Sequence, residues 1–329
     1  MEIGKLGFED LNKKIIDKIK FRRKDVLLHS GIGEDSAVVD FGEEVLVISS
    51  DPITGAAENA GYIAVHVTCN DLAATGAKPV GIQVVLLLPD SSSEDKLSKL
   101  MTEIHDTAAE LDVEILGGHT EILSTIEQPL IISTGIGKTA KDSYVPTGGA
   151  QPGDDIILTK GLGIEGIYIL ATDYSEYLQK QGISNDILQE AHKFGNKISV
   201  ITEGLIAASM GANSLHDITE GGLYGALQEM SIASNTGFEF YPEKIEIADC
   251  TKKITDTLEL DPCGLLSSGS LLISISEGEK LVEALKKKDI KAWIIGNIRD
   301  EGQYISCQGD LENFTPLQED EFWRFIKYI

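Results

Sequence analysis

The sequence predicts a protein of two domains, an α+β domain followed by an α/β domain. Its 329 residues are more than one hydrophobic core normally holds. The segment Pro146–Gly153 carries two prolines and three glycines, so it is the best candidate for a linker. We therefore expect domains at residues 1–148 and 149–329.

The first half carries strand and helix signals in the order β-β-α-β-α-β-β. An amphipathic helix over Leu11–Ile19 precedes them. Runs rich in valine and isoleucine predict the strands, and the first long helix ends at Gly76, with Pro79 beyond it as a stop signal. Two helices could cover one face of a largely antiparallel or mixed sheet. The strands are expected at 36–40, 44–50, 80–88, 113–118 and 129–138, and the helices at 58–75 and 94–111.

The second half has the pattern of a separate α/β unit. Its strands are expected at 155–159, 214–217, 271–276 and 292–296, and its helices at 185–194, 197–211, 221–234 and 278–287. The tail over 300–329 fits no clear element. Its aromatic residues predict that it packs back on the body: Phe314, Phe322, Trp323, Phe325 and Tyr328.

Charge and composition exclude several classes of binding partner. The chain has 53 acidic and 28 basic residues, a formal net charge of -25, which argues against nucleic-acid and anionic-membrane partners. Its four cysteines show no CxxC or zinc-like spacing, and we find neither an apolar signal segment nor a membrane-spanning run. We therefore expect a cytoplasmic protein with free thiols. An acidic protein can still bind ATP when metal ions offset the repulsion.

Three carboxylates stand among small residues between Gly31 and Pro79. Asp35 follows a glycine turn, Asp51 ends a strand, and Asp71 lies on a helix of small residues. Any one of them alone is typical of a capping or solvent-facing acid. Carboxylates on three different elements favour a converging site, because Mg²⁺ prefers carboxylate oxygens together with substrate phosphates.

Two glycine patterns resemble nucleotide-binding loops. Gly161–Gly166 matches G-x-G-x-x-G after a strand, but no acid follows at the end of a clear second strand, so a dinucleotide site is not favoured. The alternative that this glycine turn approaches a phosphate group of a ligand stays open. Gly135–Thr139 ends like a P-loop, but Ile132 stands where the first glycine belongs.

Two further motifs favour a functional site. In GGHTE, the backbone N–H groups that follow a strand could face phosphate. In HDITEGGL, Thr219 is a natural helix cap, but capping does not account for Asp217, Glu220 and two adjacent glycines.

Seven motifs in order resemble the aminoimidazole ribonucleotide (AIR) synthetase superfamily: GEDSAVV, SSDPITGA, NDLAATGAKP, GGHTE, TKGLGIEG, HDITEGGL and DPCGLLSSGSLLI. That superfamily also contains formylglycinamidine ribonucleotide synthetase, thiamine-monophosphate kinase, selenophosphate synthetase and the hydrogenase-maturation protein HypE. The resemblance covers about residues 1–298 and is strongest to HypE-like proteins. It implies two-domain subunits that dimerise so that their N-terminal sheets form a shared barrel.

The resemblance also implies a function. ATP and Mg²⁺ bind between the domains near the dimer interface, and the γ-phosphate passes to an amide, carbonyl or phosphate oxygen of a small substrate. By motif position, the metal ligands are Asp35, Asp51 and Asp71. The catalytic residues are Asp217 and Glu220. The remaining nucleotide-binding residues are Lys5, Asn70, Gly117, Gly118, His119 and Thr120.

Two departures from the family pattern keep alternatives open. HypE modifies its own C-terminal cysteine, whereas the last cysteine here is Cys307 and the chain ends at Ile329, so we expect no such self-modification in this form. His119 stands where some relatives carry an acid. The alternatives are a nucleotide-binding scaffold in metallocofactor assembly that has lost turnover, and a thiamine-monophosphate-type kinase.

Overall fold

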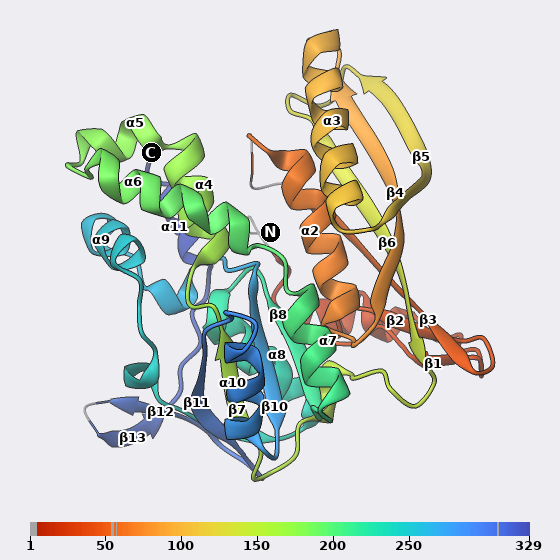
Figure 1. The fold of residues 1–329 in the computed structure, drawn as a ribbon, viewed down its shortest axis with the longest axis vertical. Helices are drawn as coiled ribbons and strands as arrows, with labels where there is room; N and C mark the ends of the chain where they lie inside the picture. The colour runs from red at the N-terminus through yellow and green to blue at the C-terminus, as the bar shows by residue number, and fades with distance from the viewer. Residues whose placement is uncertain (1–4, 54–55, 57, 308) are drawn as a thin grey trace.

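A computed structural model describes residues 5–53, 56, 58–307 and 309–329, and Figure 1 shows their arrangement around two sheets. The first sheet is mixed, with the strand order β1-β2-β3-β6-β4-β5, in which only the β4–β5 pair is parallel. Its strands are β1 (Val26–Leu28), β2 (Ala37–Asp40), β3 (Glu44–Ile53), β4 (Lys78–Pro89), β5 (Glu114–Leu123) and β6 (Leu130–Ala140).

Helices α2 (Ala60–Ala73) and α3 (Glu94–Glu110) cover one face of this sheet (Figure 1). The exposed helix α3 is amphipathic and begins where the Ser93 hydroxyl accepts a hydrogen bond from the Lys96 N–H, at 3.2 Å. Almost every residue of α2 is buried, because its second side packs against the C-terminal half. A Cβ at Gly204 of α7 would lie 2.5 Å from the Ala73 carbonyl oxygen, so glycine allows this close approach.

The other face of the first sheet is apolar, and none of the described residues of the single chain covers it. Figure 1 shows α2 and α3 on the same side of the strands. Along β3, β4 and β6 the alternate residues that point away from these helices are partly exposed and mostly apolar. They include Ile48, Val85, Leu87, Ile132 and Ile136. A sheet face of this kind is typical of an interface.

The second sheet has the order β13-β12-β9-β11-β7-β10-β8 and is antiparallel apart from the β12–β9 pair. Successive residues of its central strand β7 enter different cores: Ile156 and Leu158 pack with α8, whereas Ile157 packs with α7 and α10. The strands are β7 (Asp155–Thr159), β8 (Ser214–Ile218), β9 (Gly237–Phe240), β10 (Ser270–Ile275), β11 (Ala292–Arg299), β12 (Gln303–Cys307) and β13 (Asp310–Asn313).

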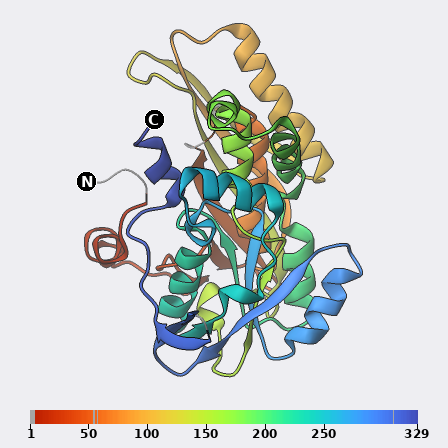
Figure 2. The same cartoon turned by 90° about the vertical axis from the view of Figure 1, so that its left-hand side faces the viewer.

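The remaining helices surround this sheet and the junction with the first one. Figure 2 shows α1 and the C-terminal helix α11 on the same side of the molecule. The helices are α1 (Phe8–Lys14), α4 (Ile164–Asp173), α5 (Ser175–Lys180), α6 (Asn185–His192), α7 (Ile201–Ser209), α8 (Gly222–Ser234), α9 (Asp249–Leu258), α10 (Gly278–Lys286) and α11 (Glu321–Ile326). None of the helices that the structure describes has the length and apolar character needed to span a bilayer.

Several elements differ from the sequence prediction. The strand expected at 292–296 is not the last, because the hairpin β12–β13 follows it, and β13 is too exposed and polar to carry an apolar strand signal. Helices α4, α5 and α9 and strand β9 were not predicted as elements. The helix expected over 197–211 begins at Ile201, after a 3-10 turn that ends at Lys197.

The tail packs back on the body, as predicted. Phe314, Phe322 and Phe325 are buried, and Trp323 packs against the core, but Tyr328 is 82% exposed. The segment 146–153 joins the two sheets and is held firmly: the Glu34 carboxylate accepts hydrogen bonds from the N–H groups of residues 147 and 148, at 3.2 and 3.1 Å. The two sheets lie on either side of residue 148, and the boundary itself stays a prediction.

Candidate functional site

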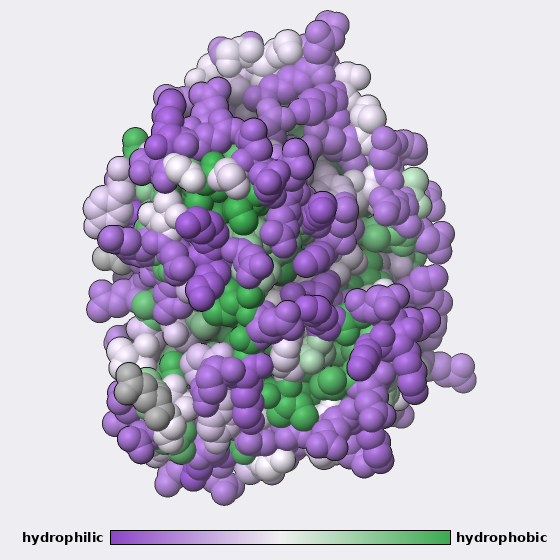
Figure 3. All heavy atoms as spheres, turned by 60° about the vertical axis from the view of Figure 1, so that its left-hand side comes forward, coloured by the Kyte–Doolittle hydropathy of each residue, from purple (hydrophilic) through white to green (hydrophobic). Residues whose placement is uncertain are grey.

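A cavity of about 430 Å³ lies between the two halves of the chain. Its lining combines the carboxylates of Asp35, Asp51, Asp71 and Asp217 with several apolar side chains. Figure 3 shows a largely hydrophilic face whose apolar residues reach the surface mainly in recesses. The cavity therefore brings charged and apolar side chains together within one space.

Four different elements bring the aspartates together. Asp35 follows the turn at Gly33, where φ is +76° and a Cβ would lie 3.0 Å from the Glu229 Cβ. Asp51 lies in β3, Asp71 on the buried helix α2, and Asp217 in the buried strand β8. The convergence predicted for Asp35, Asp51 and Asp71 is thus present in the geometry, and Asp217 joins it.

Asp71 and Asp217 are buried acids with too few donors. The Ser49 hydroxyl donates to the Asp71 carboxylate, but Asp217 Oδ2 is buried without a hydrogen-bond partner among the described residues. Burial and then the charges of Asp51 and Asp217 raise the pKa of Asp71 well above its usual range. Burial and the charge of Asp35 do the same for the pKa of Asp217. A bound cation would relieve both effects.

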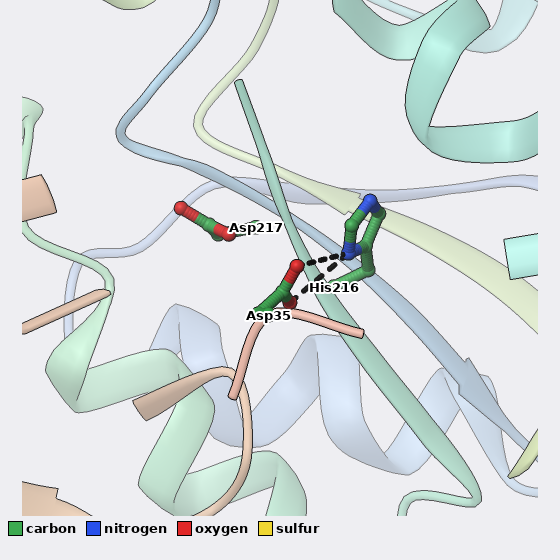
Figure 4. Close-up of side chains that lie close together, drawn as sticks. All are labelled: Asp35, His216 and Asp217. Atoms are coloured by element: carbon green, nitrogen blue, oxygen red, sulfur yellow. Dashed lines mark hydrogen bonds and ion pairs between the residues drawn. The ribbon is translucent and has the colours of Figure 1, made fainter. Parts of the chain in front are cut away.

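His216 lies between two carboxylates, those of Asp35 and Glu229. Its Nδ1 lies 2.8 Å from Asp35 Oδ1 and its Nε2 lies 2.8 Å from Glu229 Oε2; Figure 4 shows the first of these contacts. Both ring nitrogens face acceptors, so both must carry protons. Burial opposes the charge, but Asp35 and Glu229 outweigh it and hold the pKa of His216 well above its usual range. His216 is therefore an imidazolium.

Because both of its ring nitrogens carry protons, His216 is not a metal ligand. Ligand atoms of Asp35, His216 and Asp217 lie within 4.8 Å of one another, a spacing that would suit a metal ion. A ring whose two nitrogens both donate protons has no lone pair left for a metal. On the far side of the ring, burial opposes the charge of Glu229, but Lys5 and His216 outweigh it and lower its pKa to about 2.

Lys5 is held at the mouth of the cavity. Its main-chain N–H donates to Glu220 Oε1 at 2.6 Å, and its Nζ lies 3.3 Å from Thr219 Oγ1 and 3.4 Å from Glu229 Oε1. The side chain is 51% exposed, so the ammonium group faces solvent as well as the carboxylates. Lys5 and Glu220, both predicted as site residues, thus contact each other at the cavity.

The other predicted nucleotide-binding residues do not line this cavity. Asn70 is fully buried: its Nδ2 donates to the Ile198 carbonyl oxygen and its Oδ1 accepts from the Val200 N–H, both at 2.8 Å. It therefore joins α2 to the C-terminal half. The four predicted residues of the GGHTE motif lie on the exposed edge strand β5: Gly117, Gly118, His119 and Thr120. Their role in nucleotide binding stays a prediction.

Sequence reasoning missed several residues of the cavity. Glu229 carried no motif, His216 opens the HDITEGGL motif but was given no role, and Glu165 was hidden inside the G-x-G-x-x-G pattern. Asp320, in the tail, accepts hydrogen bonds from the N–H groups of Gly221 and Phe322, both at 2.6 Å, and of residue 266 at 3.3 Å. Burial raises its pKa to about 7. No sequence signal marks Asp320, because its partners are distant backbone groups.

Two family domains match the chain. The AIR synthase related protein N-terminal domain matches residues 33–139, and the corresponding C-terminal domain matches residues 151–306. The chain belongs to the AIR synthase-related family. The predicted resemblance is therefore confirmed, and so is the two-domain AIR synthase-like architecture.

Known members of this family support a kinship with HypE. A protein of Methanocaldococcus jannaschii, provisionally assigned to hydrogenase expression/formation, is 30% identical over 83% of this chain and 85% of its own length. Carbamoyl dehydratase HypE of Azotobacter vinelandii is 26% identical over 75% of this chain and 72% of its own length.

Solved structures share the fold. A HypE–HypF complex superposes with a TM-score of 0.75 at 21% identity, over 93% of this chain and 99% of the other. HypE in complex with ATP gives a TM-score of 0.67 at 20% identity, over 96% of this chain and 93% of the other.

Proposed function

We propose that this chain is an ATP- and Mg²⁺-dependent enzyme of the HypE-like kind, which transfers the γ-phosphoryl group of ATP to an oxygen of a small substrate. The observation that carries the proposal is the group of buried aspartates around the cavity, with Asp217 Oδ2 left without a partner. Such a group is costly unless a cation binds there. Both relatives named above, and both solved structures, support the family of reactions and a place in hydrogenase maturation.

The donor set fits Mg²⁺. Asp51, Asp71 and Asp217 offer hard carboxylate oxygens, which Mg²⁺ prefers, and His216 offers no free nitrogen. When bound, Mg-ATP supplies the phosphoryl group, and the metal neutralises part of its charge. Around it, His216 orients Asp35 and opposes the burial that raises the pKa of this carboxyl. Lys5 presents an ammonium group at the cavity mouth, where the phosphates of a nucleotide would enter.

Asp217 and Glu220 flank the loop that leads into α8. Asp217 has one unpartnered oxygen, and Glu220 lines the same cavity while it fixes the main chain of Lys5. In this proposal Asp217 holds a metal or the substrate, and Glu220 positions Lys5 and the substrate side of the cavity. These residues act by positioning the reactants and neutralising charge, the two contributions that phosphoryl transfer requires.

The active form in this proposal is a homodimer in which the two first sheets pair into a shared barrel. The uncovered apolar face, with Val85 and Ile132 near its centre, supports this pairing. Dimerisation would also give the exposed segment 117–120 a route to a nucleotide held by the partner subunit.

Light scattering at micromolar concentration tests the dimer. We expect twice the chain mass of 35.6 kDa for the wild type. Val85→Glu should yield monomers, because it places a charge on the apolar face. A surface control, Glu176→Gln on α5, should stay dimeric. A monomeric wild type contradicts the shared barrel.

An activity screen tests the reaction. Purified protein with Mg-ATP is offered amides, carbamoyl donors and phosphorylated metabolites, and ADP release is followed. We expect at least one compound to stimulate ADP release, and Asp217→Asn to abolish the stimulation. Mg-ATP binding without turnover on any compound would favour the scaffold, and stimulation by a phosphate ester alone would favour a thiamine-monophosphate-type kinase.

A further inference from the structure

Two adjacent glycines let the start of α8 lie against a turn that also contacts the tail. Gly221 has a φ of +93° and Gly222 a φ of +59°, and a Cβ at Gly222 would lie 2.6 Å from the Cys263 carbonyl oxygen. A Cβ at Gly264, in the same turn, would overlap Leu317 of the tail. The loop before α8, this turn and the tail therefore meet at one point.

At this point the carboxylate of Asp320 joins the segments. Its Oδ2 accepts a hydrogen bond from the Gly221 N–H at 2.6 Å. Its Oδ1 accepts from the Phe322 N–H at 2.6 Å, which caps α11, and from the Leu266 N–H at 3.3 Å. The two oxygens thus have different tasks: Oδ1 caps the helix of the tail, and Oδ2 holds the loop before α8.

The loop before α8 holds Lys5 in turn. The Lys5 main-chain N–H donates to Glu220 Oε1 at 2.6 Å, and the Lys5 Nζ lies 3.3 Å from Thr219 Oγ1. A second cavity, of about 320 Å³, has Lys5, Glu220, Gly221 and Asp320 in its lining. A chain of contacts therefore runs from Asp320 through the loop to Lys5 at the mouth of the main cavity.

A carboxylate is a costly group at this position. Asp320 is 4% exposed, and burial raises its pKa to about 7; the three N–H groups oppose the shift and the charge of Glu220 adds to it. A neutral residue such as asparagine or serine would cap α11 without burying a charge. The second oxygen of Asp320, which holds the loop before α8, therefore accounts for the carboxylate.

The tail has other contacts that keep it on the body. Phe322 is 1% exposed, and the ring of Phe325 meets those of Tyr174 and Tyr177 edge to face, with centroids 5.4 and 5.6 Å apart. The hydrogen bond between Asp320 and the loop before α8 can therefore be removed without releasing the tail.

We propose that Asp320 is a positioning residue of the nucleotide site: it fixes the loop before α8 and, through that loop, holds the Lys5 ammonium group toward the phosphates of Mg-ATP. This inference rests on the proposed function, and it adds the tail to the parts of the chain that complete the site. The Asp320 carboxylate faces three main-chain N–H groups and not the nucleotide. Its effect on binding therefore passes through Lys5.

A double-mutant cycle on Mg-ATP affinity tests this role, with Lys5→Ala and Asp320→Asn as the two changes. In Asp320→Asn the amide oxygen can still cap α11, whereas an NH₂ group replaces Oδ2 and faces the Gly221 N–H. Asp320→Ser also caps α11 but brings no amide, so it takes the place of Asp320→Asn if that variant does not fold. The matched control is Glu319→Gln, which changes the neighbouring carboxylate, a partner of Lys327.

The cycle should show that Lys5 depends on Asp320. Lys5→Ala should weaken Mg-ATP binding about tenfold in the wild type and in Glu319→Gln, the effect of losing one charge-assisted hydrogen bond. In Asp320→Asn the same change should weaken binding by less than about threefold, because Lys5 is no longer held in place. Amide hydrogen exchange should become faster over residues 218–222 of Asp320→Asn and stay unchanged over α11.

Three results overturn the inference and leave the proposed function standing. The first is an equal loss of Mg-ATP affinity on Lys5→Ala with and without the Asp320 carboxylate. The second is unchanged hydrogen exchange over residues 218–222 in the Asp320 variants. The third is loss of the folded state in both Asp320→Asn and Asp320→Ser, which would make Asp320 a residue of the fold alone. Failure of the wild type to bind Mg-ATP overturns the proposed function, and the role of Lys5 with it.

Discussion

The carboxylates of the cavity fall into two groups, which differ in whether the chain supplies their counter-charge. Asp35 and Glu229 are both paired with His216, and Glu229 is also paired with Lys5. Asp71 and Asp217 have no such cation, and burial together with neighbouring carboxylates raises their pKa values. We infer that the first group stabilises the fold with charges of the chain alone. The second group needs a bound cation to balance its charge.

The largest expected effect comes from breaking the paired group. His216→Ala leaves Asp35 and Glu229 buried and without their shared cation, so we expect a loss of about 3–5 kcal/mol in the free energy of unfolding. Urea titration at pH 6 measures it. The exposed His105→Ala on α3 is the control and should change stability by less than about 0.5 kcal/mol. Equal effects of the two variants would mean that the His216 contacts stabilise nothing.

The unpaired group should give a smaller effect, which depends on pH and on Mg²⁺. Because folding raises the pKa of Asp71 and of Asp217, the folded state binds protons more readily than the unfolded state, and stability is lost as pH rises toward 7. Without Mg²⁺, the free energy of unfolding should therefore increase between pH 7 and pH 5, by on the order of 1 kcal/mol. Saturating Mg²⁺ should flatten this dependence.

His216 and Glu229 do not produce the same pattern. Burial raises the pKa of Asp35, however, so that Asp35 contributes in the same direction as Asp71 and Asp217. The stabilising effect of His216 is complete below its unfolded pKa and is lost only as pH rises through its raised folded value, with or without Mg²⁺. The contribution of Glu229, whose pKa is lowered to about 2, is lost only as pH falls from about 4.5 toward 2. Urea titrations at pH 5, 6 and 7 with and without Mg²⁺ separate the groups. A Mg²⁺-free protein that weakens on acidification from pH 7 to 5 would contradict the comparison.

Sequence patterns predict Asp71, Asp217 and, from the paired group, Asp35, but they do not predict Glu229. Asp71 and Asp217 lie in motifs of small residues, and ordered motifs mark the fold as well as the site. Glu229 lies within α8 without any such motif, and its function depends on a contact with His216 from another element. Asp320 reaches the cavity loops from the far end of the chain. Tertiary contacts of this kind leave no local periodicity to detect.

The fold was predictable to a similar extent and for similar reasons. Strands β2, β3, β4 and β6 and helices α2 and α3 follow apolar periodicity, Gly76 and Pro79 closely. Strand β1 was not predicted, and the helix expected over Leu11–Ile19 lies instead at Phe8–Lys14. Strand β13 and helix α5 are short and polar, so only their neighbours hold them in place. The segment 117–120 pairs with β4 along one edge only, and no sequence pattern alone says what covers its exposed side.

Calorimetric titration with Mg-ATP, on the wild type and on Asp71→Asn, tests the central claim most directly. Asp71→Asn keeps the shape and the fold of the unpaired group but removes a charge that the cation needs. We expect Mg-ATP binding to weaken by more than tenfold, which is about 1.4 kcal/mol or more. Equal affinity of the two proteins for Mg-ATP would show that the unpaired carboxylates do not hold the metal–nucleotide complex.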